Sequence, residues 1–181
     1  ALRQTYPNLE LDLHAAVEFC ADAHALARCH TDIAKADIII VTLLFLEEHI
    51  QAVMPQLMAR REACDALVCA MSSSEVARMT KMGQLRMDAP DSPLMAMLKK
   101  LRGKSRPESA GASQMAMLRT LPKLLRFFPG KAQDVRSYFL TLQCWLAASE
   151  ANMVTMVAHL VSRYAAGPRV GLLGGAKQPD P

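Results

Sequence analysis

One segment constrains the fold of this chain more than any other, the apolar run from Ile38 to Phe45. It is rich in β-branched residues and shows no polar alternation, which is typical of a central parallel strand covered on both faces. The run is far shorter than the ~20 residues that a membrane-spanning helix needs. The first residues carry no signal-peptide pattern. We therefore expect a cytoplasmic protein that is not transmembrane.

Strands and helices alternate along the first half of the chain. The predicted elements are, in order, an outer strand marked by Leu9, Leu11 and Leu13, a helix from Asp22 to Ala34, the central strand, a helix from Glu47 to Arg61, a strand from Ala66 to Met71 and a helix from Glu75 to Lys81 that Gly83 ends. Pro55 is expected to kink or split its helix. This order predicts an α/β fold with a flavodoxin-like parallel sheet in three layers. Three strands make a poor doubly wound sheet, so we expect a first strand before Ala1.

The second half predicts helices without strands. We divide the chain into an α/β domain (1–88), a basic flexible linker with a short helix (89–111), a helical segment (112–166) and a linker to a downstream domain (167–181). Ser149 is expected to cap the last helix. The methionines from Met79 to Met117 are interpreted as core filler rather than as an apolar docking face.

Charge is divided unevenly between the two halves. Residues 1–91 hold 8 Lys/Arg and 13 Asp/Glu, whereas residues 92–181 hold 13 Lys/Arg and 4 Asp/Glu. A basic cluster, formed by Lys99, Lys100, Arg102, Lys104 and Arg106, is a candidate docking site for an acidic partner. No aromatic residue is interleaved with it, which argues against nucleic-acid binding.

Five cysteines form an odd set without a CxxC pair, so we expect reduced, mostly buried thiols in a reducing compartment. Cys20 and His24 lie four residues apart, with Cys29 and His30 nearby, but zinc ligands have tighter spacings. Cys69 with His49 would supply a nucleophile and a base, although no local signature surrounds the cysteine.

Ser72, Ser73 and Ser74 lie where a strand hands over to a helix, the place where α/β sheets bind anions. No glycine accompanies them to let a phosphate approach the backbone. Simple helix capping is therefore the better interpretation, and an anion site is the alternative.

Four stretches carry a recognisable pattern, residues 36–50, 64–83, 121–130 and 132–152. Their order, their spacing and the Pro129-Gly130 break resemble the amino-terminal domain of the large, porphyrin-binding subunit of magnesium chelatase, over residues 1–166. Two departures stand out. The first strand of the family is absent, and Ala148 replaces the glycine expected between the last two helices.

The resemblance implies that the whole subunit binds protoporphyrin IX through downstream domains. It also implies that two ATPase-type partners hydrolyse ATP while Mg²⁺ is inserted, in the committed step of (bacterio)chlorophyll biosynthesis. The cobaltochelatase large subunit is a related alternative. Metallation needs a base for the pyrrole N–H groups and ligands that strip water from Mg²⁺. No such cluster occurs in the sequence, so we expect an accessory or interaction domain that has no cofactor and is inactive alone.

Two further hypotheses stay open at this stage. The chain could be an independent α/β module that senses a small anion at Ser72 to Ser74. It could also be an enzyme with its own site at Cys69, or at the Cys20 and His24 pair.

Overall fold

The computed structural model describes residues 8–88 and 120–167. The basic cluster from Lys99 to Arg106 and the linker predicted at 89–111 lie outside these residues. The elements are, in order, η1 (Ala16–Glu18), α2 (Ala23–Lys35), β1 (Ile38–Thr42), α3 (Glu47–Arg60), β2 (Ala66–Ala70), α4 (Ser74–Arg78), β3 (Lys81–Met82), β4 (Leu85–Arg86), α7 (Lys131–Ala147) and α8 (Glu150–Tyr164). Residues 120–125 are also helical.

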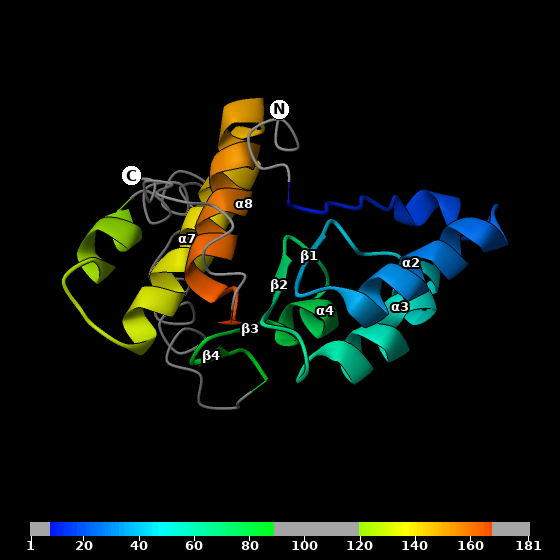
Figure 1. Cartoon of the computed structure of the whole chain (residues 1–181), viewed down its shortest axis with the longest axis horizontal. Helices are drawn as coiled ribbons and strands as arrows, with labels where there is room; N and C mark the ends of the chain where they lie inside the picture. Colours follow the sequence, from blue (N-terminus) through cyan, green and yellow to red (C-terminus); the bar gives the residue numbers. More distant parts are fainter. Residues whose placement is uncertain (1–7, 89–119, 168–181) are drawn as a thin grey trace, which may run out of the picture.

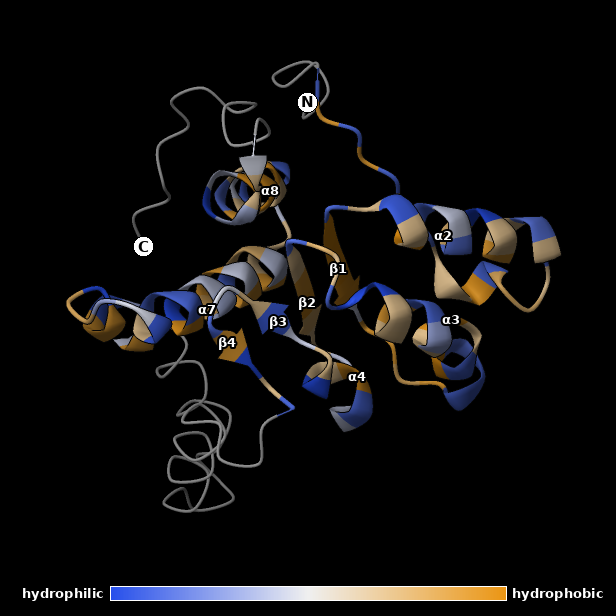
Figure 2. Ribbon diagram, turned by 60° about the horizontal axis from the view of Figure 1, so that its bottom comes forward, coloured by the Kyte–Doolittle hydropathy of each residue, from blue (hydrophilic) through white to orange (hydrophobic). Residues whose placement is uncertain are grey.

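The sheet lies between two groups of helices. Figure 1 shows α2 and α3 on one side of β1 and β2, with α7 and α8 on the other side. Figure 2 shows both strands coloured as hydrophobic, as expected for strands between two helical layers. The predicted α/β class followed by helices is therefore confirmed. The helices of the second half pack on the sheet and share its core.

The sheet is mixed rather than wholly parallel. Its order is β1-β2-β3-β4, and only β1 and β2 run parallel. The helix predicted to reach Lys81 ends at Arg78 instead, and the chain then forms a hairpin. Thr80 sets this change of direction, because its buried hydroxyl accepts from the Cys69 N–H and donates to the Cys69 carbonyl, both at 3.1 Å. Gly83 takes φ +54° in the two-residue turn.

The central strand is β2, not β1 as predicted. All five residues of β2 are buried, whereas Ile39 alone is buried in β1. Within the described residues β1 has one neighbour, β2, while β2 is paired on both edges. The β-branched run therefore indicated a strand correctly but not its place in the sheet.

The strand predicted from Leu9 to Leu13 does not form, because residues 9–13 belong to no strand or helix. Leu9 packs against the core, whereas Leu13 is 87% exposed. A period-two pattern specifies a strand only where a neighbouring strand supplies hydrogen bonds.

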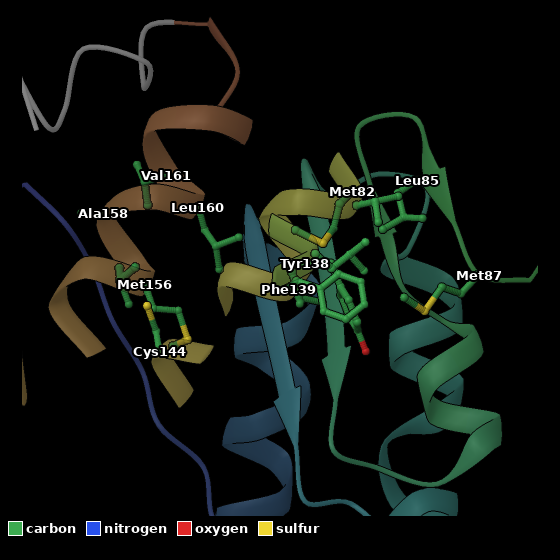
Figure 3. Packing of buried hydrophobic residues seen from close by; sticks show 14 residues of the cluster. Met82, Leu85, Met87, Tyr138, Phe139, Cys144, Met156, Ala158, Leu160 and Val161 are labelled. Carbon is green, nitrogen blue, oxygen red and sulfur yellow. The ribbon is translucent and has the colours of Figure 1, made fainter. Parts of the chain in front are cut away.

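Two apolar clusters, one on each face of the sheet, make the core. Val68 faces α7, α8 and the hairpin, while its neighbours Leu67 and Cys69 face α2, α3 and α4. Figure 3 shows Met82 and Leu85 of the hairpin near Phe139 of α7. Met82 is fully buried, which supports the core-filler interpretation at that position.

Helix boundaries follow their local sequence. Ser149 caps α8 as predicted by accepting from the Asn152 N–H at 3.2 Å. Pro55 does not split α3, which runs continuously through it. Buried Ile50 and Leu57 anchor both ends of α3 to the core and offset the missing N–H of proline.

Candidate functional site at the strand carboxyl ends

The carboxyl ends of β1 and β2 lie side by side, at the edge where α/β sheets bind ligands. Three contacts tie the two following loops together. The Leu43 N–H donates to the Met71 carbonyl at 3.1 Å, and the Ser73 N–H donates to the Leu44 carbonyl at 2.9 Å. The Leu44 N–H donates to Ser72 Oγ at 3.1 Å. The edge is therefore a fixed surface rather than two independent loops.

Two bulky residues on this edge have left-handed backbones. Leu43 has φ 58° and Met71 has φ 51°, in a region that costs a non-glycine residue about 1–2 kcal/mol. Both side chains are exposed, at 59% and 42%, as are Phe45 at 57% and Leu46 at 56%. We call Leu43, Phe45, Leu46 and Met71 the apolar crest. Strain combined with apolar exposure is a feature of binding sites rather than of stable surfaces.

The serines predicted at this edge are engaged by the protein. Ser72 Oγ donates to the Ala70 carbonyl at 3.1 Å in addition to its contact with Leu44. Ser73 Oγ caps α4 by accepting from the Val76 N–H at 3.4 Å. Ser74 begins the helix. These contacts support the capping interpretation, and an anion site there remains a prediction.

Neither cysteine pair considered from sequence has the surroundings that its expected role needs. Asp22 Oδ1 accepts from the His24 N–H at 2.8 Å and begins α2 at Ala23, so Cys20 precedes the helix and shares no helix face with His24. Burial raises the pKa of the Cys29 thiol to about 11. Burial also raises the pKa of the fully enclosed Cys69 thiol to about 12, so neither is a thiolate nucleophile at neutral pH.

Cys20 lies near Glu48 and His49 rather than pairing with His24 as considered from the sequence. Its sulfur, a Glu48 carboxylate oxygen and a His49 ring nitrogen lie within 4.8 Å of one another. We call these three residues the Cys-Glu-His trio. It is the one group of this kind found among residues 8–88 and 120–167.

The sequence interpretation missed the crest and the proximity of Glu48 to Cys20. A signal for the crest existed, because Leu43 to Leu46 continues the apolar run past the end of the strand. No signal linked Cys20 to Glu48, which lies 28 residues further along the chain. In the described part of the chain, no helix is both long and apolar enough to cross a membrane.

Comparison with known proteins agrees with the resemblance. Residues 1–139 match the family described as a domain of unknown function, DUF3479. The chain is 51% identical over 166 residues to the magnesium-chelatase H subunit of Cereibacter sphaeroides and 46% identical over 165 residues to that of Rhodobacter capsulatus. Each match covers 91% of this chain and 14% of the relative. The chloroplastic magnesium-chelatase protein ChlH of Oryza sativa subsp. indica is 30% identical over 149 residues, which cover 82% of this chain and 11% of the relative.

The chain thus spans about one seventh of the length of the bacterial relatives, as their 14% coverage shows. The chain belongs to the DUF3479 family, the amino-terminal domain of the magnesium-chelatase H subunit.

Proposed function

We propose that this chain is the amino-terminal interaction domain of the porphyrin-binding subunit of a magnesium chelatase. The complete enzyme would insert Mg²⁺ into protoporphyrin IX, with ATP hydrolysed by two ATPase-type subunits, in (bacterio)chlorophyll biosynthesis. Relatives that carry the magnesium-chelatase name and match over 91% of this chain support this enzyme over a cobaltochelatase. Free thiols at all five cysteines suit a cytoplasmic location.

The chemistry itself belongs elsewhere in the enzyme. Mg²⁺ needs oxygen ligands in octahedral geometry, and metallation needs a base for the pyrrole N–H protons. Among the described residues, the one candidate metal-binding group contains a thiol and an imidazole and offers a single carboxylate. We therefore propose no catalytic residue among residues 8–88 and 120–167.

The observation that carries the interaction role is the apolar crest. Its four side chains lie exposed on one edge, and two of them are held there by a strained backbone. The occupant we propose is another part of the same large subunit, because the relatives are about seven times as long as the segment that this chain matches. Burying the crest against that region would remove apolar surface from water, and each fully buried leucine or phenylalanine contributes about 1.5–3 kcal/mol.

The first experiment supplies the isolated chain with ATPase subunits, ATP, Mg²⁺ and protoporphyrin IX. No magnesium porphyrin should form, although circular dichroism should show a folded domain. Turnover by this chain alone would place chemistry within it and contradict the proposal.

The second experiment tests the crest in the full-length subunit. Phe45→Ser and Leu43→Ser should reduce magnesium insertion several-fold and expose the boundary between domains to limited proteolysis. The matched control is Met58→Ser, since Met58 is 62% exposed on α3 but lies outside the crest. The same activity and proteolysis in crest and control variants would rule out the docking role. Reduced insertion without any change in proteolysis would instead indicate a partner subunit as the occupant.

The basic cluster is a second docking surface in this proposal. Between Lys99 and Arg136 the sequence holds ten Lys/Arg and two Asp/Glu. Reversing Lys99, Lys100, Arg102 and Lys104 to Glu should slow assembly of the complete enzyme most at low salt, because salt screens charges beyond a Debye length of about 8 Å at physiological ionic strength. Equal turnover at every salt concentration would leave these residues as an ordinary solvated segment.

A further inference from the structure

The Cys-Glu-His trio brings three different metal-ligand types to one point of the surface. Its ligand atoms lie within 4.8 Å of one another, and Glu48 Oε1 is 3.9 Å from His49 Nε2. Around a tetrahedral ion with bonds of about 2.0–2.3 Å, neighbouring ligands lie roughly 3.3–3.8 Å apart. Cys20 and Glu48 are exposed, so rotation of their side chains can shorten these distances.

Core residues lie directly next to two of the three ligands in the sequence. Phe19 precedes Cys20 and is buried, and Ile50 follows His49 and is 2% exposed. Both belong to the same apolar cluster beneath α2 and α3. The backbones that carry the ligands are therefore fixed, which lowers the entropy lost when an ion is bound.

We propose that the trio is a binding site for Zn²⁺ or a similar borderline divalent cation. Thiolate and imidazole ligands favour Zn²⁺, whereas Mg²⁺ favours oxygen ligands and dehydrates reluctantly. Cys20 is the one exposed cysteine of the five, and all five lie in the described part of the chain. The site is thus accessible to the ion and is chemically distinct from any site that handles the Mg²⁺ substrate.

The ion would have three protein ligands and one open position for water. It would join the turn before α2 to the first turn of α3. Phe45 and Leu46 of the apolar crest immediately precede α3, so the ion would also fix the base of the crest. This zinc site does not depend on the proposed chelatase role.

The test uses the 181-residue chain and Zn²⁺ in competition with a chromophoric chelator. We expect one equivalent to bind, and Co²⁺ in its place should give the charge-transfer and visible bands of a tetrahedral thiolate site. Cys20→Ser, His49→Gln and Glu48→Gln should each weaken Zn²⁺ binding at least about ten-fold. Replacing a residue that only hydrogen-bonds to a metal ligand already lowers metal affinity by about ten-fold or more. Excess Mg²⁺ should not displace the bound ion.

Two matched controls identify the site. His24→Gln removes the residue that sequence spacing paired with Cys20, and His14→Gln removes a histidine that contacts Asp32 at 2.9 Å. Both should bind Zn²⁺ as the parent does. Zinc should also raise the melting temperature of the parent but not of Cys20→Ser. No saturable binding, or unchanged binding by a Cys20→Ser variant that circular dichroism shows to be folded, would overturn the proposal.

Discussion

Gly83 and Asp134 form a contact whose energy can be measured. Gly83 turns the hairpin at φ +54°, and a Cβ added there would lie 2.7 Å from Asp134 Oδ2. Asp134 is buried, with its side chain 9% exposed, and its carboxylate accepts from the Gln84 N–H at 2.8 Å, from the Tyr164 hydroxyl at 3.0 Å and from Arg163 at 3.1 Å. It therefore ties the hairpin to α7 and α8 and has little freedom to move aside.

The expected cost of Gly83→Ala has two parts. The left-handed backbone costs about 1–2 kcal/mol for alanine. Displacing Asp134 weakens hydrogen bonds to a charged group, which costs about 1–3 kcal/mol more. Asp134→Ala should itself cost about 1–3 kcal/mol, because the Gln84 N–H and the Tyr164 hydroxyl lose their acceptor, while the Arg163 side chain is 26% exposed to water. Once the carboxylate is gone, only the backbone part of the Gly83→Ala cost should remain.

A double-mutant cycle measures this difference. Urea denaturation of the parent, both single variants and the double variant should give a coupling free energy of about 1–3 kcal/mol, with the double variant more stable than additivity predicts. Gly130→Ala is the matched control, because Gly130 also has positive φ, at +71°, but its nearest neighbour is Gln84 Oε1 at 3.9 Å. The loss of unfolding free energy caused by Gly130→Ala should be the same in the parent and in the Asp134→Ala variant. If the free-energy changes of Gly83→Ala and Asp134→Ala are additive to within about 0.5 kcal/mol, a Cβ at position 83 does not displace the Asp134 carboxylate and the prediction is wrong.

Three further predictions concern stability. Ala148 ends α7 at φ 50°, so Ala148→Gly should raise the free energy of unfolding by about 0.5–1 kcal/mol in urea titrations. Val68→Asp should abolish the cooperative thermal transition, because it puts an unpaired charge in the buried strand β2, whereas Ile40→Asp in half-buried β1 should only lower the melting temperature. Burial lowers the pKa of His159 from 6.5 to about 4, so the unfolded chain binds the proton more readily. Stability should therefore fall by up to about 3 kcal/mol as pH drops from 6.5 to 4, and His159→Gln should remove that slope.

Local signals in the sequence predicted local structure well. The helix predicted to start at Asp22 starts one residue later, with Asp22 as its cap, and Ser149 caps its helix as predicted. The break between α7 and α8 also forms at Ala148, where the family pattern expects glycine. Alanine takes the left-handed conformation there, and its N–H donates to the Trp145 carbonyl at 3.1 Å. Tertiary packing of the two helices thus outweighs a local preference of about 1–2 kcal/mol.

Relations between distant segments were harder to predict. The apolar run from Ile38 to Phe45 indicates a buried strand. Its place in the sheet depends on which other strands pair with it, and the amino-acid composition of the run does not determine that. The hairpin has a weak signal, since Gly83 and Gln84 separate two short apolar and basic segments at the two-residue spacing of a tight turn. The same glycine equally fits the end of a helix, so the signal alone does not separate the two structures.

The apolar crest shows why an exposed surface feature can be missed in a sequence whose fold class is predicted correctly. Positive φ is normally signalled by glycine, yet Leu43 and Met71 adopt it without that signal. Hydrogen bonds between the two loops, including the one from the Leu43 N–H to the Met71 carbonyl, hold the backbone in place. Apolar residues that follow a strand usually indicate more core, but here the left-handed backbone accompanies their exposure to solvent. The proposed binding role would account for an edge that presents apolar surface to water at a cost of about 1–2 kcal/mol per strained residue.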